Sequence, residues 1–150
     1  MISTLDHAEQ SFASQIVAIQ QRSYPIEAAL MGVGTLPPMN DTVEDIQSSK
    51  ETFIGFLHTD FLVGFIAYEH VCNTVVITRL AVDPALFNQG IASSLLQHVL
   101  HLQTEMFEVT TGAENEPAIQ LYQKHGFHIT GIIIPEPEIQ LVRLIHKKSS

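Results

Sequence analysis

The sequence is poor in positive charge. It holds 7 Lys and Arg residues against 16 Asp and Glu residues, which gives a net charge of −9 at pH 7. Proteins that bind nucleic acid or anionic membranes depend on clustered Lys and Arg to neutralise phosphates. We therefore expect neither nucleic acid nor a membrane surface as a partner. The excess of negative charge instead favours cationic substrates such as amines.

Cysteine and long hydrophobic runs are also scarce. The single cysteine, Cys72, cannot form an internal disulfide, which fits a reducing cytoplasm. The longest apolar run, Phe61 to Tyr68, is far shorter than the roughly 20 residues that cross a bilayer. Because no positive charge precedes Arg22 and no apolar h-region occurs near the start, we expect no signal peptide. These absences predict a soluble, cytoplasmic protein.

The composition that remains is that of one folded domain. The chain has 150 residues, of which 45% are hydrophobic and 15% charged. This length can bury a sizeable core, and this apolar fraction argues against a disordered or fibrous chain. No internal repeat, low-complexity tract or linker divides the sequence. We expect a single domain over residues 1–150.

Helical patterns open the chain. Apolar residues recur at helical spacing from Asp6 to Gln21, which predicts a helix. Several Gly and Pro residues interrupt Tyr24 to Asn40, which we interpret as an irregular loop. Thr42 to Ser49 is expected to form a short helix, because Thr42 and Asp45 have the spacing of a capping box.

Three strands are predicted next. The segments Thr52 to His58 and Phe61 to His70 are rich in Phe, Ile and Val, and Thr59-Asp60 between them suits a tight turn. Asn73 to Val82 forms a third strand, which ends at Asp83-Pro84. Because the two longer runs are almost continuously apolar, we expect helices on both faces of the sheet.

The apolar period changes at Gly90. A helix is predicted from Gly90 to about Gln103, and a second from Asn115 to His125, with Asn115 as its cap and Gly126 beyond its end. Further strands are predicted at Met106 to Thr111, Phe127 to Ile134 and Glu138 to Ile145. This order of elements indicates a mixed α/β domain around one sheet.

The stretch from Leu80 to Leu96 carries the main chemical signal. A strand ends at Val82, a loop follows, and a helix begins at about Gly90. A helix N-terminus presents unpaired N–H groups and the positive end of the helix dipole, both of which bind phosphates. Because Gly90 and Ala92 carry little or no side chain, a pyrophosphate can approach this backbone without help from charged side chains.

Two motifs resemble the GNAT superfamily of N-acetyltransferases. Its signature, Gln/Arg-x-x-Gly-x-Gly/Ala after a strand with an L-x-V-x-P ending, corresponds to Phe87–Ala92 after Leu80–Pro84. A second element, N-x-x-A-x-x-(L/F)-Y-x-x-x-G-F, corresponds to Asn115–Phe127. The resemblance covers nearly the whole chain. It implies a GNAT-like mixed, mostly antiparallel sheet with helices on both faces and a splayed central strand pair.

The resemblance also implies acetyl-CoA as a co-substrate and direct transfer of its acetyl group to an amine. The main-chain N–H of Val82 would polarise the thioester carbonyl, Tyr122 would protonate the departing thiolate, and Asn115 would bond the pantetheine arm. The implied cofactor-binding residues are Leu80, Ala81, Val82, Phe87, Asn88, Gln89, Gly90, Ile91, Ala92, Ser93, Asn115, Ala118 and Tyr122.

The sequence departs from the family pattern in three places. Phe87 stands where relatives usually have Arg or Gln, and no Lys or Arg occurs from Leu80 to Gln123, so backbone amides would hold the phosphates almost alone. The family's first strand has no clear counterpart. The strand predicted at Asn73–Val82 has no carboxylate where several relatives carry a Glu. The first and third departures favour an alternative function, a non-catalytic acyl-CoA-binding sensor or regulatory module.

The general base stays open at this stage. Glu69 and His70, on the neighbouring strand, are the nearest candidates, and a solvated strand end explains both residues equally well. A nucleotide-binding domain built on Gly90 is disfavoured, because the loop lacks the Lys and Ser/Thr of a phosphate-binding P-loop.

The acceptor is expected to be a small-molecule amine or a peptide amino group. This fold usually builds its acceptor pocket from the segment between Tyr24 and Asn40, which contains Met31, Leu36 and Met39, although a loop packed on the sheet edge is equally compatible. Dimers are common among relatives, so a homodimer is one expected state.

No metal is expected. The eight histidines include two close pairs, but neither pair comes with carboxylate or Cys ligands at metal-binding spacing. These pairs are His98 with His101 and His125 with His128. Cys72 has no orienting partners of the kind that activate a nucleophile, and we interpret it as a strand-end thiol.

Overall fold

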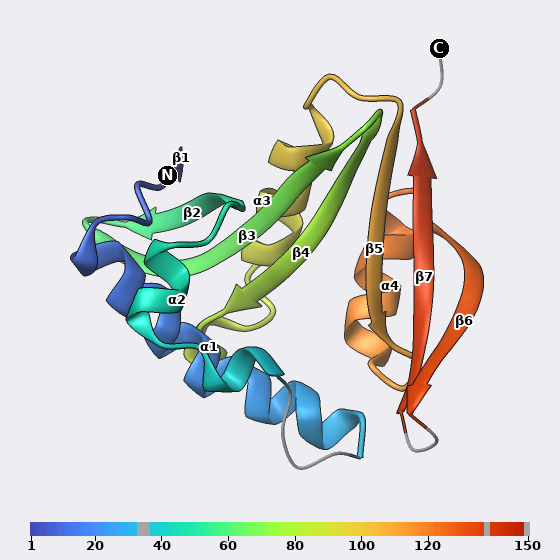
Figure 1. The fold of residues 1–150 in the computed structure, drawn as a ribbon, viewed down its shortest axis with the longest axis horizontal. Coiled ribbons are helices and arrows are strands. Elements are labelled where there is room, and N and C mark those ends of the chain that lie inside the picture. Colours follow the sequence, from blue (N-terminus) through green and yellow to red (C-terminus); the bar gives the residue numbers. More distant parts are fainter. Residues whose placement is uncertain (33–36, 137–138, 149–150) are drawn as a thin grey trace.

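The computed structural model describes residues 1–32, 37–136 and 139–148, and its elements follow the predicted order (Figure 1). The helices are α1 (Gln10–Leu30), α2 (Val43–Gln47), α3 (Ile91–Leu100) and α4 (Glu116–Lys124), with short 3-10 turns η1 (Pro37–Asn40) and η2 (Pro84–Leu86). The strands are β1 (Ile2–Thr4), β2 (Thr52–His58), β3 (Phe61–Val71), β4 (Thr74–Val82), β5 (Met106–Gly112), β6 (His128–Glu136) and β7 (Ile139–Lys147).

Within the described residues, the strands form one seven-stranded sheet in the order β1-β2-β3-β4-β5-β7-β6. Every neighbouring pair is antiparallel except β4 and β5, which are parallel and are joined through α3. The N-terminal residues supply the first strand that the sequence left unassigned, since Ile2–Thr4 pair with β2. The predicted fold class, a mostly antiparallel mixed sheet, is confirmed.

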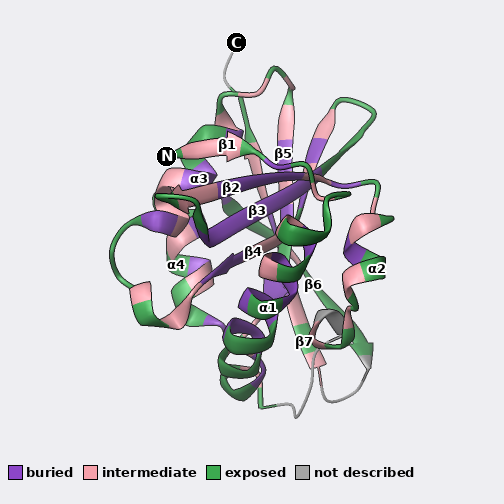
Figure 2. Cartoon of the chain, turned by 90° about the vertical axis from the view of Figure 1, so that its left-hand side faces the viewer, coloured by how far each residue is buried: buried purple, intermediate pink, exposed green. Residues whose placement is uncertain are grey.

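Helices cover both faces of the sheet, as the continuous apolar runs predicted. One core lies under α1 and α2 and includes Ile16, Phe53 and Phe65, which are all fully buried. The other lies under α3 and α4 and includes Leu95 and Phe107. Figure 2 shows the buried stretches gathered on the central strands, while the outer surface of α1 is exposed. β3 contributes to both cores, which explains why its sequence does not alternate.

Helix α1 extends much further than the sequence indicated. We expected a loop from Tyr24, but the helix continues to Leu30 with Pro25 inside it. A proline removes one helical hydrogen bond, yet Pro25 itself is exposed while Tyr24 and Ala28 are buried against the core. Burial of this apolar face outweighs the missing bond. Leu36, part of the expected loop, lies outside the described residues.

The other boundaries agree with the predictions to within a few residues. Helix α2 begins after Thr42, whose hydroxyl accepts from the N–H of Asp45, while the Asp45 carboxylate accepts from the N–H of Thr42, which completes the predicted capping box. Helix α3 ends at Leu100, earlier than the predicted Gln103. Among the described residues, no helix combines the length and the apolar character needed to cross a membrane.

Candidate active site

The central parallel strands separate to form a cleft. β4 and β5 pair as far as Ile77 and Val109, although β4 continues to Val82 and β5 to Gly112. Figure 1 shows the two strands diverging below that point. A cleft of about 960 Å³ opens there, lined by the two strands together with parts of α1, α3 and α4. This volume suits a small-molecule ligand.

The backbone of Val82 faces this cleft. The N–H of Asp83 donates to the carbonyl oxygen of Val63 at 2.8 Å, and Val82 stands opposite Gly64 in the β3–β4 register. This combination makes Val82 and Gly64 a non-hydrogen-bonded pair, in which both residues point their N–H and C=O groups away from the partner strand. The Val82 N–H therefore points to the side from which β5 has diverged.

Helix α3 begins at the mouth of the same cleft. Gly90 is its N-cap residue and has a φ of 79°, and Asn88 before it has a φ of 65°. A Cβ on Gly90 would have no neighbouring atom within 4 Å, so steric crowding does not require glycine here. The left-handed backbone conformation is what favours it. Among the described residues, no acidic side chain occupies the first turn of α3, which leaves its amides available to an anion.

Helix α4 forms the opposite wall through Asn115, Ala118 and Tyr122, which lie on one stripe as predicted. The Asn115 side chain accepts from the N–H of Ala118 at 3.3 Å and so caps the helix, and its amide nitrogen lies 3.5 Å from the Thr111 hydroxyl. Tyr122 is 4% exposed. Burial, with a smaller effect from the charge of Glu27, raises the pKa of Tyr122, so the phenol stays protonated at neutral pH.

The cleft gathers the residues that the sequence motifs single out, with one exception. Those that line it are Leu80, Ala81, Val82, Phe87, Asn88, Gly90, Ile91, Ala92, Ser93, Asn115, Ala118 and Tyr122. Gln89 is not a lining residue. The two motifs thus meet in space, although most of α3 and the whole of β5 separate them in the chain.

Comparison with known proteins identifies the family to which this arrangement belongs. Residues 49–129 match the family model of the acetyltransferase (GNAT) domain. The chain belongs to the GNAT acetyltransferase family. The match confirms the resemblance based on the two motifs, and it includes the splayed strand pair, the start of α3 and the whole of α4.

Similar proteins differ in length and in their reported activities. The chain is 38% identical over 129 residues to the UPF0157 protein YqkA of Bacillus subtilis, a match that covers 85% of this chain but 38% of YqkA. It is 23% identical over 133 residues to the peptidyl-lysine N-acetyltransferase YjaB of Salmonella typhimurium, with 87% of each covered. The crystal structure of PaiA N-acetyltransferase from Thermoplasma acidophilum in complex with coenzyme A has the same fold, with a TM-score of 0.79, 14% identity and 99% coverage of both chains.

The GNAT cleft does not include the two residues considered for the general base. Glu69 is opposite Val76 in the β3–β4 register, six positions from Val82, and His70 lies further still. At roughly 3.3 Å per residue, Glu69 is about 20 Å from Val82 along the strand. Both residues are exposed at the far end of the sheet, so neither can take a proton from an amine at Val82.

Helix α1 brings a carboxylate into the GNAT cleft that the sequence did not single out. Glu27 lines the cleft together with Asn115, whose nearby side chain favours the charged form of the carboxylate. One turn further along, the Met31 side chain lies so close to Gly112 that a Cβ there would be 2.6 Å from it. The last turns of α1 therefore reach across the gap between β4 and β5. The spacing of Ile16, Gln20, Tyr24 and Ala28 signals this longer helix once Pro25 is tolerated.

The end of α4 adds polar groups beside the start of α3. The Ser93 hydroxyl lies 2.6 Å from the His125 ring nitrogen Nε2, and the neighbouring Lys124 lines the cleft. Burial, together with Lys124 and His146, lowers the pKa of His125, so its ring is neutral at pH 7. Lys124 thus supplies a positive charge to a cleft whose α3 side has none. It directly follows the stretch Leu80–Gln123, which contains no Lys or Arg.

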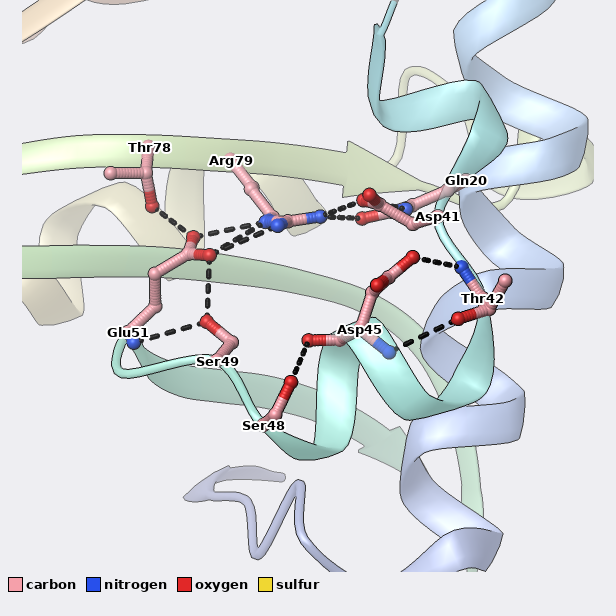
Figure 3. A network of polar contacts seen from close by, with 9 residues as sticks. All are labelled: Gln20, Asp41, Thr42, Asp45, Ser48, Ser49, Glu51, Thr78 and Arg79. Carbon is pink, nitrogen blue, oxygen red and sulfur yellow. Dashed lines mark hydrogen bonds and ion pairs between the residues drawn. The ribbon is translucent and has the colours of Figure 1, made fainter.

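An ionic network fixes the helical layer to β4 (Figure 3). Arg79 on β4 forms ion pairs with Glu51 at 2.9 Å and with Asp41 at 2.5 Å, and it donates to the side chain of Gln20 at 2.8 Å. The Thr78 hydroxyl also donates to Glu51. These contacts tie Gln20 of α1, Asp41 between η1 and α2, and Glu51 directly before β2 to one strand of the cleft. They therefore position α1 over it.

Proposed function

We propose that the protein transfers an acetyl group from acetyl-CoA to a primary amine by direct attack, without a covalent enzyme intermediate. The observation that carries this proposal is the position of the Val82 N–H, which points into the cleft between the start of α3 and Tyr122. A donor there can bond the oxygen of a thioester carbonyl and stabilise the oxyanion that forms on attack.

The remaining groups of the cleft suit the coenzyme. The free edge of β4 beyond Ile77 can pair with an extended pantetheine arm as an added strand would. The α3 amides and Lys124 suit its phosphates. The PaiA structure holds coenzyme A on the same fold, and YjaB is named for acetylating lysine side chains, which supports an amine acceptor. The match covers only 38% of YqkA. The proposed activity is therefore that of this domain, and not that of a longer protein such as YqkA.

Tyr122 is proposed to donate its phenol proton to the coenzyme thiolate as the C–S bond breaks. Its raised pKa keeps the hydroxyl protonated, as a proton donor must be before the reaction. The phenol is a weak acid, so the thiolate receives the proton as negative charge accumulates on sulfur, and the hydroxyl is reprotonated within the same turnover.

The test combines binding and turnover. Calorimetry with acetyl-CoA, followed by a thiol-release assay with a panel of primary amines, is expected to show binding and then transfer. Tyr122→Phe is expected to lower kcat about 100-fold with little change in acetyl-CoA affinity, because general acid catalysis contributes at least this much. Tyr68→Phe, at a buried tyrosine outside the cleft, is the matched control and should leave kcat unchanged.

A regulatory acyl-CoA-binding module is the second candidate, and Phe87 favours it. Phe87 is 41% exposed at the cleft where relatives usually place a polar or cationic side chain. Tight acetyl-CoA binding without thiol release on any amine, and no effect of Tyr122→Phe, would establish the module and contradict the enzyme. Failure to bind coenzyme A in any form would contradict both.

A further inference from the structure

Glu27 occupies a special position in the cleft. Among the cleft-lining residues in the part of the chain that the structure describes, it is the one carboxylate. It lies on α1, which covers one face of the sheet, yet it lines the same cleft as Asn115 at the start of α4, which covers the other face. Residues from both helical layers can share this cleft because β4 and β5 have separated. Glu27 therefore shares the cleft with the Asn115–Tyr122 stripe.

The reaction proposed above needs a proton acceptor. An alkylamine, with a pKa of about 10.4 for lysine, is an ammonium ion at neutral pH and has no free electron pair with which to attack. A base in contact with the ammonium must remove a proton before the C–N bond forms. The candidates at the end of β3 are too distant, and β4 carries no carboxylate.

We propose that Glu27 is the catalytic base, and that it selects primary alkylammonium acceptors by binding their charge inside the cleft. This inference rests on the proposed acetyl transfer and assigns the residue that begins it. Leu30 and Met31, which also line the cleft, supply apolar surface beside the carboxylate for the carbon chain of such an acceptor.

The proton balance is complete with these groups. The ammonium gives one proton to the Glu27 carboxylate, and the neutral nitrogen forms a bond to the thioester carbonyl carbon. The C–S bond breaks as the tetrahedral intermediate collapses, and the nitrogen loses a second proton as the amide forms. That proton ends on the coenzyme sulfur by way of Tyr122. Glu27 returns its proton to solvent, so ammonium and thioester become amide, thiol and one released proton.

The groups around Glu27 are compatible with this role. Burial raises the pKa of Glu27 above its ordinary value of 4.5, and the nearby Asn115 side chain offsets part of that rise. Tyr24 and Tyr122 face it from α1 and α4, and burial keeps both phenols neutral. Arg79 of β4 is held by Glu51 and Asp41, and Lys124 lies at the far end of α4. A raised carboxylate pKa makes a stronger base for the ammonium.

The decisive experiment is the pH profile of kcat/KM for an alkylamine, such as butylamine, and for a lysine peptide. With Glu27→Gln we expect activity at pH 7 to fall about 100-fold or more. The loss should shrink steadily toward pH 10, because the variant depends on the free amine already present in solution. Acetyl-CoA affinity by calorimetry should stay within about twofold, since glutamine keeps the size and polarity of the side chain. A higher kcat/KM for butylamine would indicate a small-molecule acceptor, and a higher kcat/KM for the lysine peptide would indicate a lysine side chain.

Glu9→Gln is the matched control, because Glu9 is exposed at the other end of the same helix and its loss changes the net charge equally. It should leave the pH profile unchanged. Folding is checked separately by measuring the free energy of unfolding. Because the pKa of Glu27 is raised in the folded state, ionisation of this carboxylate at higher pH lowers the stability of the fold. Glu27→Gln should therefore be at least as stable as the wild type at pH 7.

Two results would overturn the assignment. One is unchanged activity of Glu27→Gln at pH 7, and the other is a loss of the same size at every pH, which indicates a structural role alone. In either case the wild type still acetylates amines, so the proposed function survives. If the wild type acetylates no amine, the proposed function and the base both fall.

Discussion

At the scale of single residues, Arg79 shows how a largely buried charge can be tolerated. Its side chain is 15% exposed, and its guanidinium has three partners from segments that are distant in the sequence. Burial by itself raises the pKa of Glu51, but hydrogen bonds from Arg79, Thr78 and Ser49 hold it below its usual range. The Arg79 cation and its two carboxylate partners, Glu51 and Asp41, therefore stabilise one another.

Arg79→Met should strongly destabilise the fold, because it leaves Glu51 and Asp41 without their cation. We expect the free energy of unfolding to drop by about 3 kcal/mol, at the lower end for loss of one member of a buried pair, since Asp41 retains some solvent contact. Urea unfolding measures this loss of free energy. Arg22→Met removes an ion pair to Asp83 from an Arg22 side chain that is 54% exposed, and it should cost less than about 1 kcal/mol. Equal losses in the two variants would contradict the structural role of Arg79.

At the scale of elements, the start of α3 combines a strained backbone with an open face. Gly90 adopts a left-handed conformation that a side chain disfavours by roughly 1–2 kcal/mol. The Cβ of any other residue would point into open space at the cleft, where the phosphates are proposed to bind. One glycine thus serves both the turn and the access of a ligand.

Gly90→Ala should therefore lower the free energy of unfolding by about 1 kcal/mol and weaken coenzyme A binding. Thermal unfolding and calorimetry measure the two effects. Gly131→Ala on β6 is the matched control, since Gly131 has equally open surroundings but no left-handed φ. The control should be neutral or slightly stabilising. Coenzyme A affinity that is the same in both variants would place the phosphates elsewhere.

At the scale of the whole molecule, the cleft joins the two halves of the sheet. β1 to β4 lie on one side of the divergence and β5 to β7 on the other, and they pair over Thr74–Ile77 and Met106–Val109. A ligand that fills the open part of this junction contacts α1, α3 and α4 together. Binding should therefore stabilise the protein as a unit.

Coenzyme A at 100 times its dissociation constant should add about 2.7 kcal/mol to the free energy of unfolding. For a chain of this length, that corresponds to a rise in Tm of roughly 5–10 °C. Differential scanning calorimetry is the measurement, with ATP at the same concentration as the control. ATP has phosphates but no pantetheine arm to pair with β4, so it should raise Tm much less. Equal shifts would indicate a nucleotide site in place of the proposed cleft.

Local sequence patterns were enough to predict most of the strands and helices and the family. Strands such as Thr52–His58 were predicted from local composition, since β-branched and aromatic residues fit a pleated surface, and the Thr42–Asp45 capping box depends on contacts within one turn. The two GNAT motifs indicated Val82, Gly90, Asn115 and Tyr122. Each motif spans few residues, so the backbone positions that it requires can be recognised from the sequence alone.

Only the packing of the whole chain brings Glu27 to the cleft and takes Glu69 away from it. Glu27 belongs to no motif, and its place in the cleft depends on α1 continuing past Pro25, which burial of Tyr24 and Ala28 makes favourable. Glu69 lies on the strand next to that of Val82 and was the nearest candidate base, but the antiparallel register of two long strands carries it to the opposite end. Register and helix length are set by packing across the whole sheet, which no local pattern contains.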